Sequence, residues 1–304
     1  MNIDIYEGDC IEQLKRLADQ SINTCITSPP YWGLRNYQED KQLGMEDTPE
    51  EFISNLVDVF REVKRVLRDD GTVWLNLGDT YCGTGHKGNY TDPKHKEGRN
   101  GQKIALNNKI DGLKSKDLVG IPWRVALALQ QDGWYLRQDI IWHKPNPMPE
   151  SVTDRCTKSH EYIFLLSKNA KYYFDNESIK EDSVTIIKKR TRKTGTGVDS
   201  NIGNKGSAGN NGKRNKRSVW TVPTKPFKGA HFATFPPDLI EPCVLAGGPE
   251  GGTVLDPFGG AGTTGIVAQQ HNRDSILIEL NPDYIEIAEK RLNNDAPLFN
   301  EVVA

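Results

Sequence analysis

The fold is decided by the stretch "TVLDPFGGAGTTG", residues 253–265. An apolar strand pattern ends at Asp256, and closely spaced glycines then lead into a helical pattern. In an open α/β sheet, ligands bind just beyond the carboxyl ends of the strands, where such a loop lies. The next strand pattern, at 274–280, ends in Glu279, and a carboxylate there can accept both hydroxyl hydrogen bonds of a ribose. The segment therefore predicts a site for a nucleoside-type cofactor.

The same glycines allow a second interpretation. Gly260, Gly262 and Gly265 satisfy the G-x-G-x-x-G pattern of dinucleotide-binding oxidoreductases. Only 39 residues follow Gly265, which is too few to complete a dinucleotide-binding domain, so the N-terminal part would have to complete the sheet. On these residues alone, a nicotinamide-dependent oxidoreductase stays an alternative, and binding of NAD would reveal it.

A second informative stretch, "CITSPPYWGL", occupies residues 25–34. Two consecutive prolines fix φ and remove two backbone donors, and the residue before each proline is kept out of the helical region. The turn after the strand is therefore stiff, its carbonyl groups point in fixed directions, and Tyr31 stands beside them. Such a turn is suited to holding hydrogen-bond acceptors in place.

Strand and helix patterns alternate along most of the chain. Strands are expected at 2–10, 22–30, 71–79, 135–144, 161–168, 252–258 and 274–280, and helices at 11–20, 48–71, 120–134, 236–247, 262–271 and 282–293. Alternation of this kind predicts an α/β fold with a mostly parallel sheet and helices on both faces.

The five cysteines are scattered, and none forms a C-x-x-C pair. Their distribution predicts reduced thiols, with no disulfide framework and no metal site. No apolar stretch is long enough to span a bilayer, and the N-terminus lacks the pattern of a signal peptide. We therefore expect a cytoplasmic protein that does not associate with membranes.

The net charge of −2 conceals two basic segments rich in glycine and asparagine. Between 186 and 217, ten lysines and arginines face one acidic residue, and between 84 and 116 eight face three. Basic segments on an acidic body suit a polyanion that binds on one side. We expect one domain over 1–304, with insertions at about 83–116, a mobile loop, and at about 180–220.

Together, "TSPPY" at 27–31 and "DPFGGAGTTG" at 256–265 resemble the amino-methylating DNA methyltransferases, which use S-adenosylmethionine to modify cytosine N4 or adenine N6. The proline turn precedes the glycine loop, as in the permuted (beta-class) group of that family. The resemblance implies a Rossmann-like methyltransferase fold with circularly permuted motif order. It also implies that S-adenosylmethionine binds in preference to NAD.

The resemblance carries over to particular residues. Catalysis would fall to Ser28, Pro29, Pro30 and Tyr31, and the flipped target base would lie near Asn146, Pro147 and Met148. The cofactor would be bound by Asp9, Cys10, Thr234, Asp256, Phe258, Gly260, Gly262, Thr263 and Glu279. Residues 1–304 would form one methyltransferase catalytic domain, and the insertion at about 180–220 would be its target-recognition region. Duplex DNA would be contacted by Lys188, Lys189, Arg190, Arg192, Lys193, Lys213, Arg214, Lys216 and Arg217. A cognate restriction endonuclease and a homodimer are compatible with such an enzyme, and the sequence decides neither.

The proposed chemistry explains the stiff turn. An exocyclic base amine is a poor nucleophile, and two acceptors aimed at its N–H bonds free its lone pair for attack on a methyl group. Ser28 and the Pro29 carbonyl would be these acceptors, and Tyr31 would stack on the base after it has left the duplex. In the family that the chain resembles, a leading serine such as Ser28 goes more often with cytosine N4 and a leading aspartate with adenine N6. The resemblance therefore implies cytosine N4, with adenine N6 as the alternative. A DNA-binding relative without activity remains a further alternative, although the turn and the loop are both intact.

Overall fold

The computed structural model describes residues 1–33, 42–83, 110–183, 212–225, 234–295 and 302–303. Most of the predicted mobile loop at 83–116 and much of the predicted target-recognition region at 180–220 lie outside these ranges. The predicted DNA contacts Lys188, Lys189, Arg190, Arg192 and Lys193 also lie outside the described residues.

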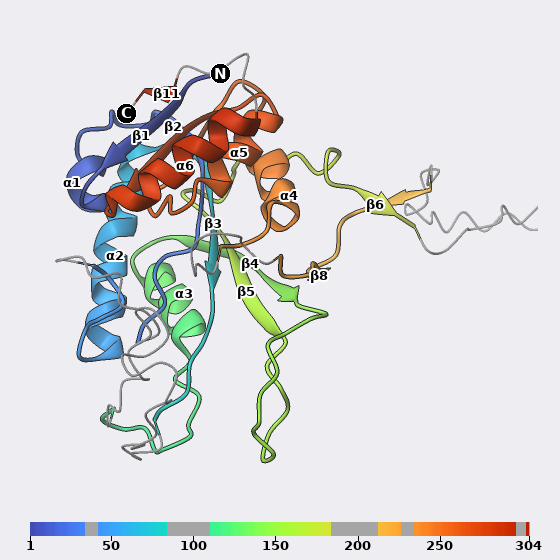
Figure 1. Cartoon of the computed structure of the whole chain (residues 1–304). Helices are drawn as coiled ribbons and strands as arrows, with labels where there is room; N and C mark the ends of the chain where they lie inside the picture. The colour runs from blue at the N-terminus through green and yellow to red at the C-terminus, as the bar shows by residue number, and fades with distance from the viewer. Residues whose placement is uncertain (34–41, 84–109, 184–211, 226–233, 296–301, 304) are drawn as a thin grey trace, which may run out of the picture.

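One mixed sheet forms the centre of the molecule (Figure 1), in the spatial order β11-β1-β10-β9-β2-β3-β5-β4-β8. Only β5 runs antiparallel to its neighbours, β3 and β4, so the prediction of a mostly parallel sheet is confirmed. The strands span β1 Ile3–Glu7, β2 Ile22–Thr27, β3 Leu67–Leu77, β4 Tyr135–His143, β5 His160–Ser167, β8 Val219–Thr221, β9 Thr253–Asp256, β10 Asp274–Glu279 and β11 Val302–Val303. A separate short ribbon pairs β6, Glu181–Asp182, with β7, Lys213–Arg214.

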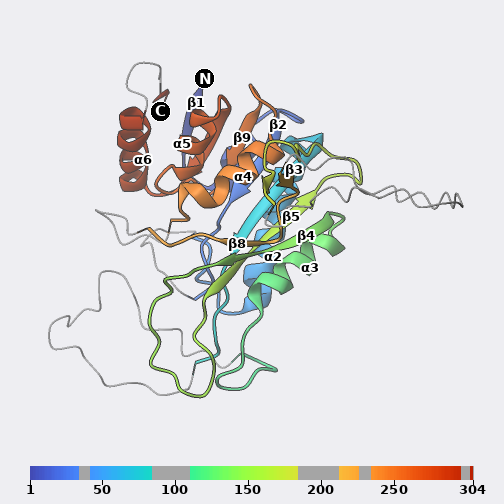
Figure 2. The same cartoon turned by 90° about the vertical axis from the view of Figure 1, so that its right-hand side faces the viewer.

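Helices cover both faces of the sheet, as the sequence predicts (Figure 2). They span α1 Cys10–Leu14, α2 Pro49–Val66, α3 Ile121–Gln131, α4 Pro237–Gly247, α5 Thr263–Gln270 and α6 Pro282–Asp295. The alternation of side chains along β3 shows the two layers. Val73 and Leu75 join the core under α1, α2 and α3, whereas Trp74 between them joins the core under α4 and α5. The helix α6 packs over β1 and β10 in a smaller cluster.

The N-terminus of helix α2 is capped by Thr48. The side chain of Thr48 accepts a hydrogen bond from the Glu51 backbone at 3.1 Å, and Pro49 occupies the first turn. The helix ends five residues earlier than its expected limit of 71, because Leu67 turns to an extended conformation and pairs with Ile22 of β2. Leu67 is fully buried. Residues 67–71 therefore belong to β3, although their local sequence pattern predicts that the helix continues.

The helix α1 is also shorter than the expected 11–20. Asp9 caps it by accepting a hydrogen bond from the Glu12 backbone at 3.0 Å. Beyond Leu14 the backbone bonds tighten, as Arg16 and Leu17 each donate to a carbonyl three residues back. Within the described residues, no helix is both long enough and apolar enough to cross a membrane.

The topology brings together the two motifs of the sequence. The parallel strands β1, β10, β9, β2 and β3 all end at one edge of the sheet. Along the chain β9 leads to β10 on one side, whereas β2 leads to β3 on the other, so the chain changes direction between β9 and β2. Thr27 at the end of β2 donates a 2.6 Å hydrogen bond to Asp256 at the end of β9. A crevice is expected at such a switch point.

Candidate functional site

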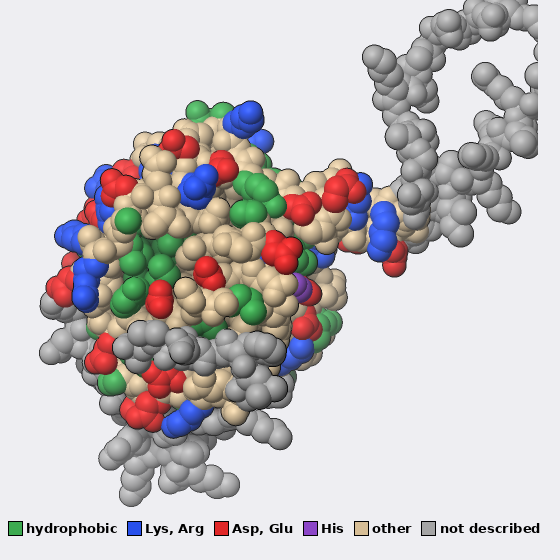
Figure 3. Space-filling model, turned by 90° about the horizontal axis from the view of Figure 1, so that it is seen from above, with side chains coloured by type: hydrophobic (Ala, Val, Ile, Leu, Met, Phe, Trp, Pro, Cys, Tyr) green, Lys and Arg blue, Asp and Glu red, His purple; other side chains and the backbone are tan. Residues whose placement is uncertain are grey.

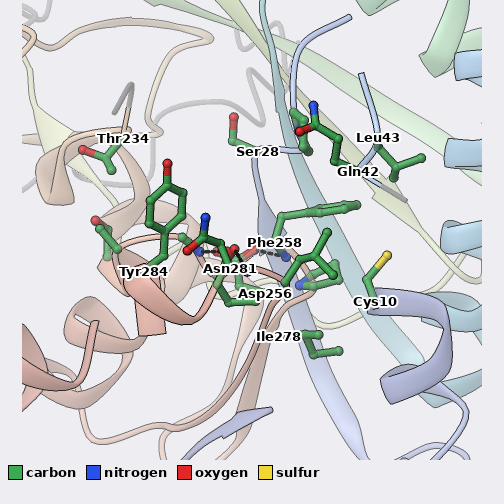
Figure 4. Close-up of a pocket in the computed structure, with 18 of the residues that line it drawn as sticks. Cys10, Ser28, Gln42, Leu43, Thr234, Asp256, Phe258, Ile278, Asn281 and Tyr284 are labelled. Carbon is green, nitrogen blue, oxygen red and sulfur yellow. Dashed lines mark hydrogen bonds between the residues drawn. The ribbon is translucent and has the colours of Figure 1, made fainter. Parts of the chain in front are cut away.

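A cleft lies at this edge of the sheet, with a volume of about 1020 Å³ when its solvent-open mouth is included. Figure 4 shows Thr234 and Tyr284 on one side of the cleft and Cys10 and Leu43 on the other. The predicted site residues that line it are Asp9, Cys10, Ser28, Pro30, Thr234, Asp256, Phe258, Gly260, Thr263 and Glu279.

Glu279 stands at the end of β10 with its carboxylate fixed by the backbone. One oxygen accepts from Gly260 N at 2.8 Å and the other from Asn281 N at 2.9 Å. Burial raises the pKa of this carboxyl, although the two backbone donors oppose the shift. Each carboxylate oxygen has a second lone pair, so Glu279 can still accept hydrogen bonds from hydroxyl groups of a ligand.

Asp256 is more deeply buried than Glu279, and its carboxylate is hydrogen-bonded to other groups of the protein. It accepts hydrogen bonds from the hydroxyls of Thr27 and Thr264 at 2.6 Å each, and from Phe258 N at 3.1 Å. Burial raises the pKa of Asp256 to about 6 despite these bonds. Asp256 thereby ties the end of β2 to the loop after β9 and to the first turn of α5. It shapes the cleft that it lines.

Gly262 does not line the cleft, although the sequence places it among the cofactor residues. It precedes α5 with φ at +74°, and a Cβ there would lie 2.9 Å from the Cβ of Ala288 on α6. A side chain is excluded by the neighbouring helix and by the backbone conformation. The missing side chain of Gly262 lets α6 pack closely against the loop. The motif predicts instead that Gly262 contacts the ligand.

Asp9 and Cys10 reach the cleft from the first turn of α1. Burial and the neighbouring Asp9 raise the pKa of the Cys10 thiol to about 12, so this thiol lines the cleft in its neutral form. Thr234 and Phe235 precede α4 and close the opposite side, whereas residues 226–233 before them lie outside the described ranges. The described residues contain no group of three or more His, Cys, Asp or Glu that could hold a metal ion.

The proline turn stands at the rim of the same cleft. Ser28 and Pro30 line the cleft, and Figure 4 places Ser28 beside Gln42. Pro29 and Tyr31 are not among the lining residues. The Tyr31 ring lies over Gly78 at the end of β3, where a Cβ would come within 2.5 Å of a ring carbon. The Ser28 hydroxyl lies 3.5 Å from the Tyr31 hydroxyl, which is a weak contact.

Tyr31 is anchored by side chains of two other strands. Its hydroxyl lies 2.7 Å from Glu161 Oε2 and 3.2 Å from Asn76 Oδ1. Glu161 in turn forms a short ion pair with Lys144, whose ammonium group lies 4.1 Å from the centre of the Trp142 ring. These groups, drawn from β3, β4, β5 and the turn, form a polar cluster that sequence analysis missed.

Asn146, Pro147 and Met148 do not reach the cleft. They follow β4. Asn146 and Met148 are exposed and Pro147 is partly buried, and Met148 has 84% of its surface accessible. The side chain of Asn146 accepts from Thr224 N at 2.9 Å and donates to the Thr224 carbonyl at 3.1 Å. In this structure the segment therefore pins the residues after β8, and no described contact joins it to the turn.

The described part of the basic segment 186–217 projects from the body on the β6–β7 ribbon (Figure 1). Acidic and basic side chains are intermixed on this arm (Figure 3). Two of the predicted DNA contacts are already paired, since Lys213 lies 2.9 Å from Asp182 and Arg214 lies 2.9 Å from Glu181. Lys216 lies 5.0 Å from the centre of the Trp220 ring. A shallow hollow is lined by Arg214, Lys216 and Arg217 among others.

Further cleft residues escaped the sequence analysis, although a local signal was present. Asn281 and Tyr284 line the cleft directly after Glu279, and Asn281 caps the first turn of α6 by accepting from Asp283 N. An Asn-Pro pair that follows an acidic strand end could have indicated them. Gln42 and Leu43 also line the cleft, and no pattern in the sequence distinguishes them.

Comparison with known proteins agrees with this geometry. A family model described as DNA methylase matches residues 22–290. The chain is 48% identical over 293 residues to the type II methyltransferase M.Cfr9I of Citrobacter freundii, with 96% of this chain and 88% of that protein covered. It is 47% identical over 290 residues to the type II methyltransferase M.SmaI of Serratia marcescens, with 95% and 90% covered.

Two solved structures have a similar fold. The PvuII DNA methyltransferase, described as cytosine-N4-specific, matches with a TM-score of 0.65 at 18% identity and covers 100% of this chain and 89% of its own. A putative DNA modification methylase from Thermus thermophilus, in complex with S-adenosyl-L-methionine, matches with a TM-score of 0.59 at 22% identity and full coverage of both chains. These matches confirm the predicted methyltransferase fold.

Proposed function

The chain belongs to the DNA methylase family, and on that premise we propose that it methylates the N4 amine of cytosine in duplex DNA. One observation carries the assignment of the site. Ser28 of the proline turn and the loop around Gly260 line a single cleft, although 232 positions separate them in the chain. The structural condition for group transfer is that donor and acceptor can be held side by side, and this cleft meets it.

S-adenosylmethionine is the methyl donor of this family, and it supplies an electrophilic methyl group when bound. The side chains that line the cleft suit its nucleoside part. Glu279 offers carboxylate lone pairs for ribose hydroxyls, and Phe258 and Ile278 offer apolar surface. We propose that Asp9, Glu279 and the backbone around Gly260 hold this cofactor, with Thr234 and Thr263 at its ends.

The target amine is assigned to the proline turn. We propose that Ser28 Oγ and the Pro29 carbonyl accept the two N–H bonds of the amine and orient its lone pair toward the cleft. Because both acceptors belong to a stiff turn, little reorganisation is needed when the reaction occurs. Tyr31 would stack on the base after the base has left the duplex.

The choice of cytosine N4 over adenine N6 rests on Ser28. A neutral serine at the first position of the turn favours cytosine in enzymes of this kind, whereas an aspartate favours adenine. Nucleosides released from DNA methylated in vitro distinguish the two products directly. N4-methylcytosine is expected, and N6-methyladenine would overturn the choice of base while leaving the enzyme class intact.

We propose that DNA contacts the β6–β7 arm and that residues 1–304 act as one catalytic domain. The relatives named above are type II enzymes, so a cognate restriction endonuclease is the expected companion. Sedimentation of the protein with and without duplex DNA would test whether it acts as a homodimer.

Methyl transfer from labelled S-adenosylmethionine to mixed-sequence duplex DNA tests the proposal, with the wild type and Tyr31→Ala in parallel. The wild type should incorporate label and the variant should lose most of it. Tyr135→Ala is the matched control, because Tyr135 is an exposed tyrosine at the opposite edge of the sheet. Equal incorporation by wild type and Tyr31→Ala would move the base site away from the turn.

A further inference from the structure

We propose that Glu161 is a positioning residue for catalysis, which acts through the hydroxyl of Tyr31. The inference rests on the proposed function of the proline turn and extends it to a strand 130 residues away. Glu161 would hold the tyrosine ring in one orientation. The ring would then be ready to stack on the target base before DNA binds.

The hydrogen-bond geometry makes Glu161 the principal anchor. A phenol has one proton to donate. Of its two acceptors, Glu161 Oε2 is nearer, at 2.7 Å, than Asn76 Oδ1, at 3.2 Å. A bond to a carboxylate is shorter and stronger than one between neutral groups. The Tyr31 proton is therefore assigned to Glu161, and Asn76 supports the same carboxylate through Nδ2 at 3.3 Å.

The carboxylate itself is held in place from the other side. Lys144 of the β4–β5 connection pairs with Glu161 Oε1, and the two side chains are only 18% and 15% exposed. Lys144 also lies over the Trp142 ring. With one oxygen committed to Lys144 and the other to Tyr31, the carboxylate has little freedom to rotate. The anchor is preorganised.

The ring of Tyr31 is then confined by two contacts of different kinds. Gly78 lies against the ring, where even a methyl group would come within 2.5 Å of Cε2. Glu161 holds the hydroxyl end. A base that stacks on Tyr31 must therefore approach from a side that Gly78 does not occupy. Loss of Glu161 would leave the ring supported but free to swing, and small displacements of a positioning group reduce rates strongly.

A double-mutant cycle tests this role, with wild type, Glu161→Ala, Tyr31→Phe and the double variant. The readouts are kcat, KM for DNA and the dissociation constant of S-adenosylmethionine. Each single variant should lose roughly tenfold to a hundredfold in kcat/KM for DNA, the range for a bond to a charged group. The double variant should lose less than about twofold beyond Tyr31→Phe, because the same contact is already absent.

Conservative replacement separates positioning from general stability. Glu161→Gln keeps an acceptor for the Tyr31 hydroxyl, so it should recover most of the activity that Glu161→Ala loses. Thermal unfolding is measured for each variant, and cofactor affinity should stay within about twofold of wild type. The fluorescence of 2-aminopurine at the target position reports whether the base is still extruded and stacked.

Glu62→Ala is the matched control, because Glu62 forms a half-exposed ion pair with Arg65 on α2 and no described contact joins it to Tyr31. It should keep wild-type kinetics. Independent losses that multiply in the double variant would overturn the inference, as would an unchanged Glu161→Ala enzyme. Failure of the wild type to methylate any DNA would instead contradict the proposed function, so the two failures are distinguishable.

Discussion

The two halves of the cleft hold their polar groups in different ways. In the cofactor half, which comprises residues 256–263 and 279–281, the buried carboxylates are bonded mainly to backbone and hydroxyl donors close by in the fold. In the turn half, which comprises residues 28–31 with Asn76, Gly78, Lys144 and Glu161, side chains of distant segments bond to one another. The first half depends on main-chain conformation, and the second depends on how three strands align.

The difference suggests how each half tolerates change. Backbone donors persist when a side chain is replaced, so the cofactor half should fail mainly through lost ligand contacts or unpaired donors. A side-chain cluster fails through misplacement of its remaining members. Substitutions in the two halves should therefore separate cofactor affinity from turnover.

The largest effect is expected for Glu279→Ala. Two hydrogen bonds from ribose hydroxyls to a carboxylate contribute roughly 1.5–3 kcal/mol each, so affinity for S-adenosylmethionine should fall by roughly a hundredfold to ten-thousandfold. Titration calorimetry measures the loss, and Glu62→Ala serves again as the control. Unchanged affinity would mean that the ribose lies elsewhere and that the cofactor half has been assigned wrongly.

Asp256→Asn should alter the pH dependence of stability. Since burial raises the folded-state pKa of Asp256 from 3.8 to about 6, the folded protein binds this proton more tightly than the unfolded chain does. The contribution to the free energy of unfolding is therefore fully present below about pH 4 and is lost as the pH rises through 6, by up to about 3 kcal/mol.

Denaturant unfolding of wild type and Asp256→Asn between pH 4 and 7 measures this contribution. The difference in free energy of unfolding, wild type minus variant, should fall as the pH rises. A difference that stays constant across this range would show that Asp256 titrates normally.

Gly78→Ala tests the turn half. The new Cβ would lie 2.5 Å from a carbon of the Tyr31 ring, so the ring must move away from β3. The rate of methyl transfer should fall roughly tenfold to a hundredfold while cofactor affinity is retained. In a Tyr31→Ala background the same substitution should have little further effect. A fall in cofactor affinity instead would show that the two halves are not separable.

The smallest effect is expected on the β6–β7 arm. Lys213 and Arg214 already face Asp182 and Glu181, so neutralising both should weaken DNA binding less than neutralising Lys216 and Arg217. The salt dependence of DNA affinity measures the difference. Each phosphate contact that is lost reduces the slope of log affinity against log salt concentration by about one. Equal slopes for the two double variants would contradict this distinction between the two pairs of cations.

Several features could be predicted because they depend on neighbouring residues. The α/β alternation and the glycine loop followed by a strand that ends in Glu279 are local patterns, and the structure confirms the strands and helices that they predict. The structure adds that the proline turn and the glycine loop meet, because the carboxyl ends of parallel strands share one edge of the sheet.

Other features depended on long-range packing that no local pattern encodes. The close packing of α6 explains why residue 262 is a glycine. The pairing of Leu67 with Ile22 explains why α2 ends at Val66. The Asn146 segment is drawn to Thr224, away from the cleft.

Residue type and spacing predicted two features of the cleft. They are a stiff turn after one strand, and a glycine loop followed by a strand that ends in a carboxylate. The tertiary structure decided which side chains act on them. Tyr31 meets Glu161 because β2, β3, β5 and the end of β4 are aligned by sheet register, and a contact of 2.7 Å between residues 130 positions apart depends on that alignment alone.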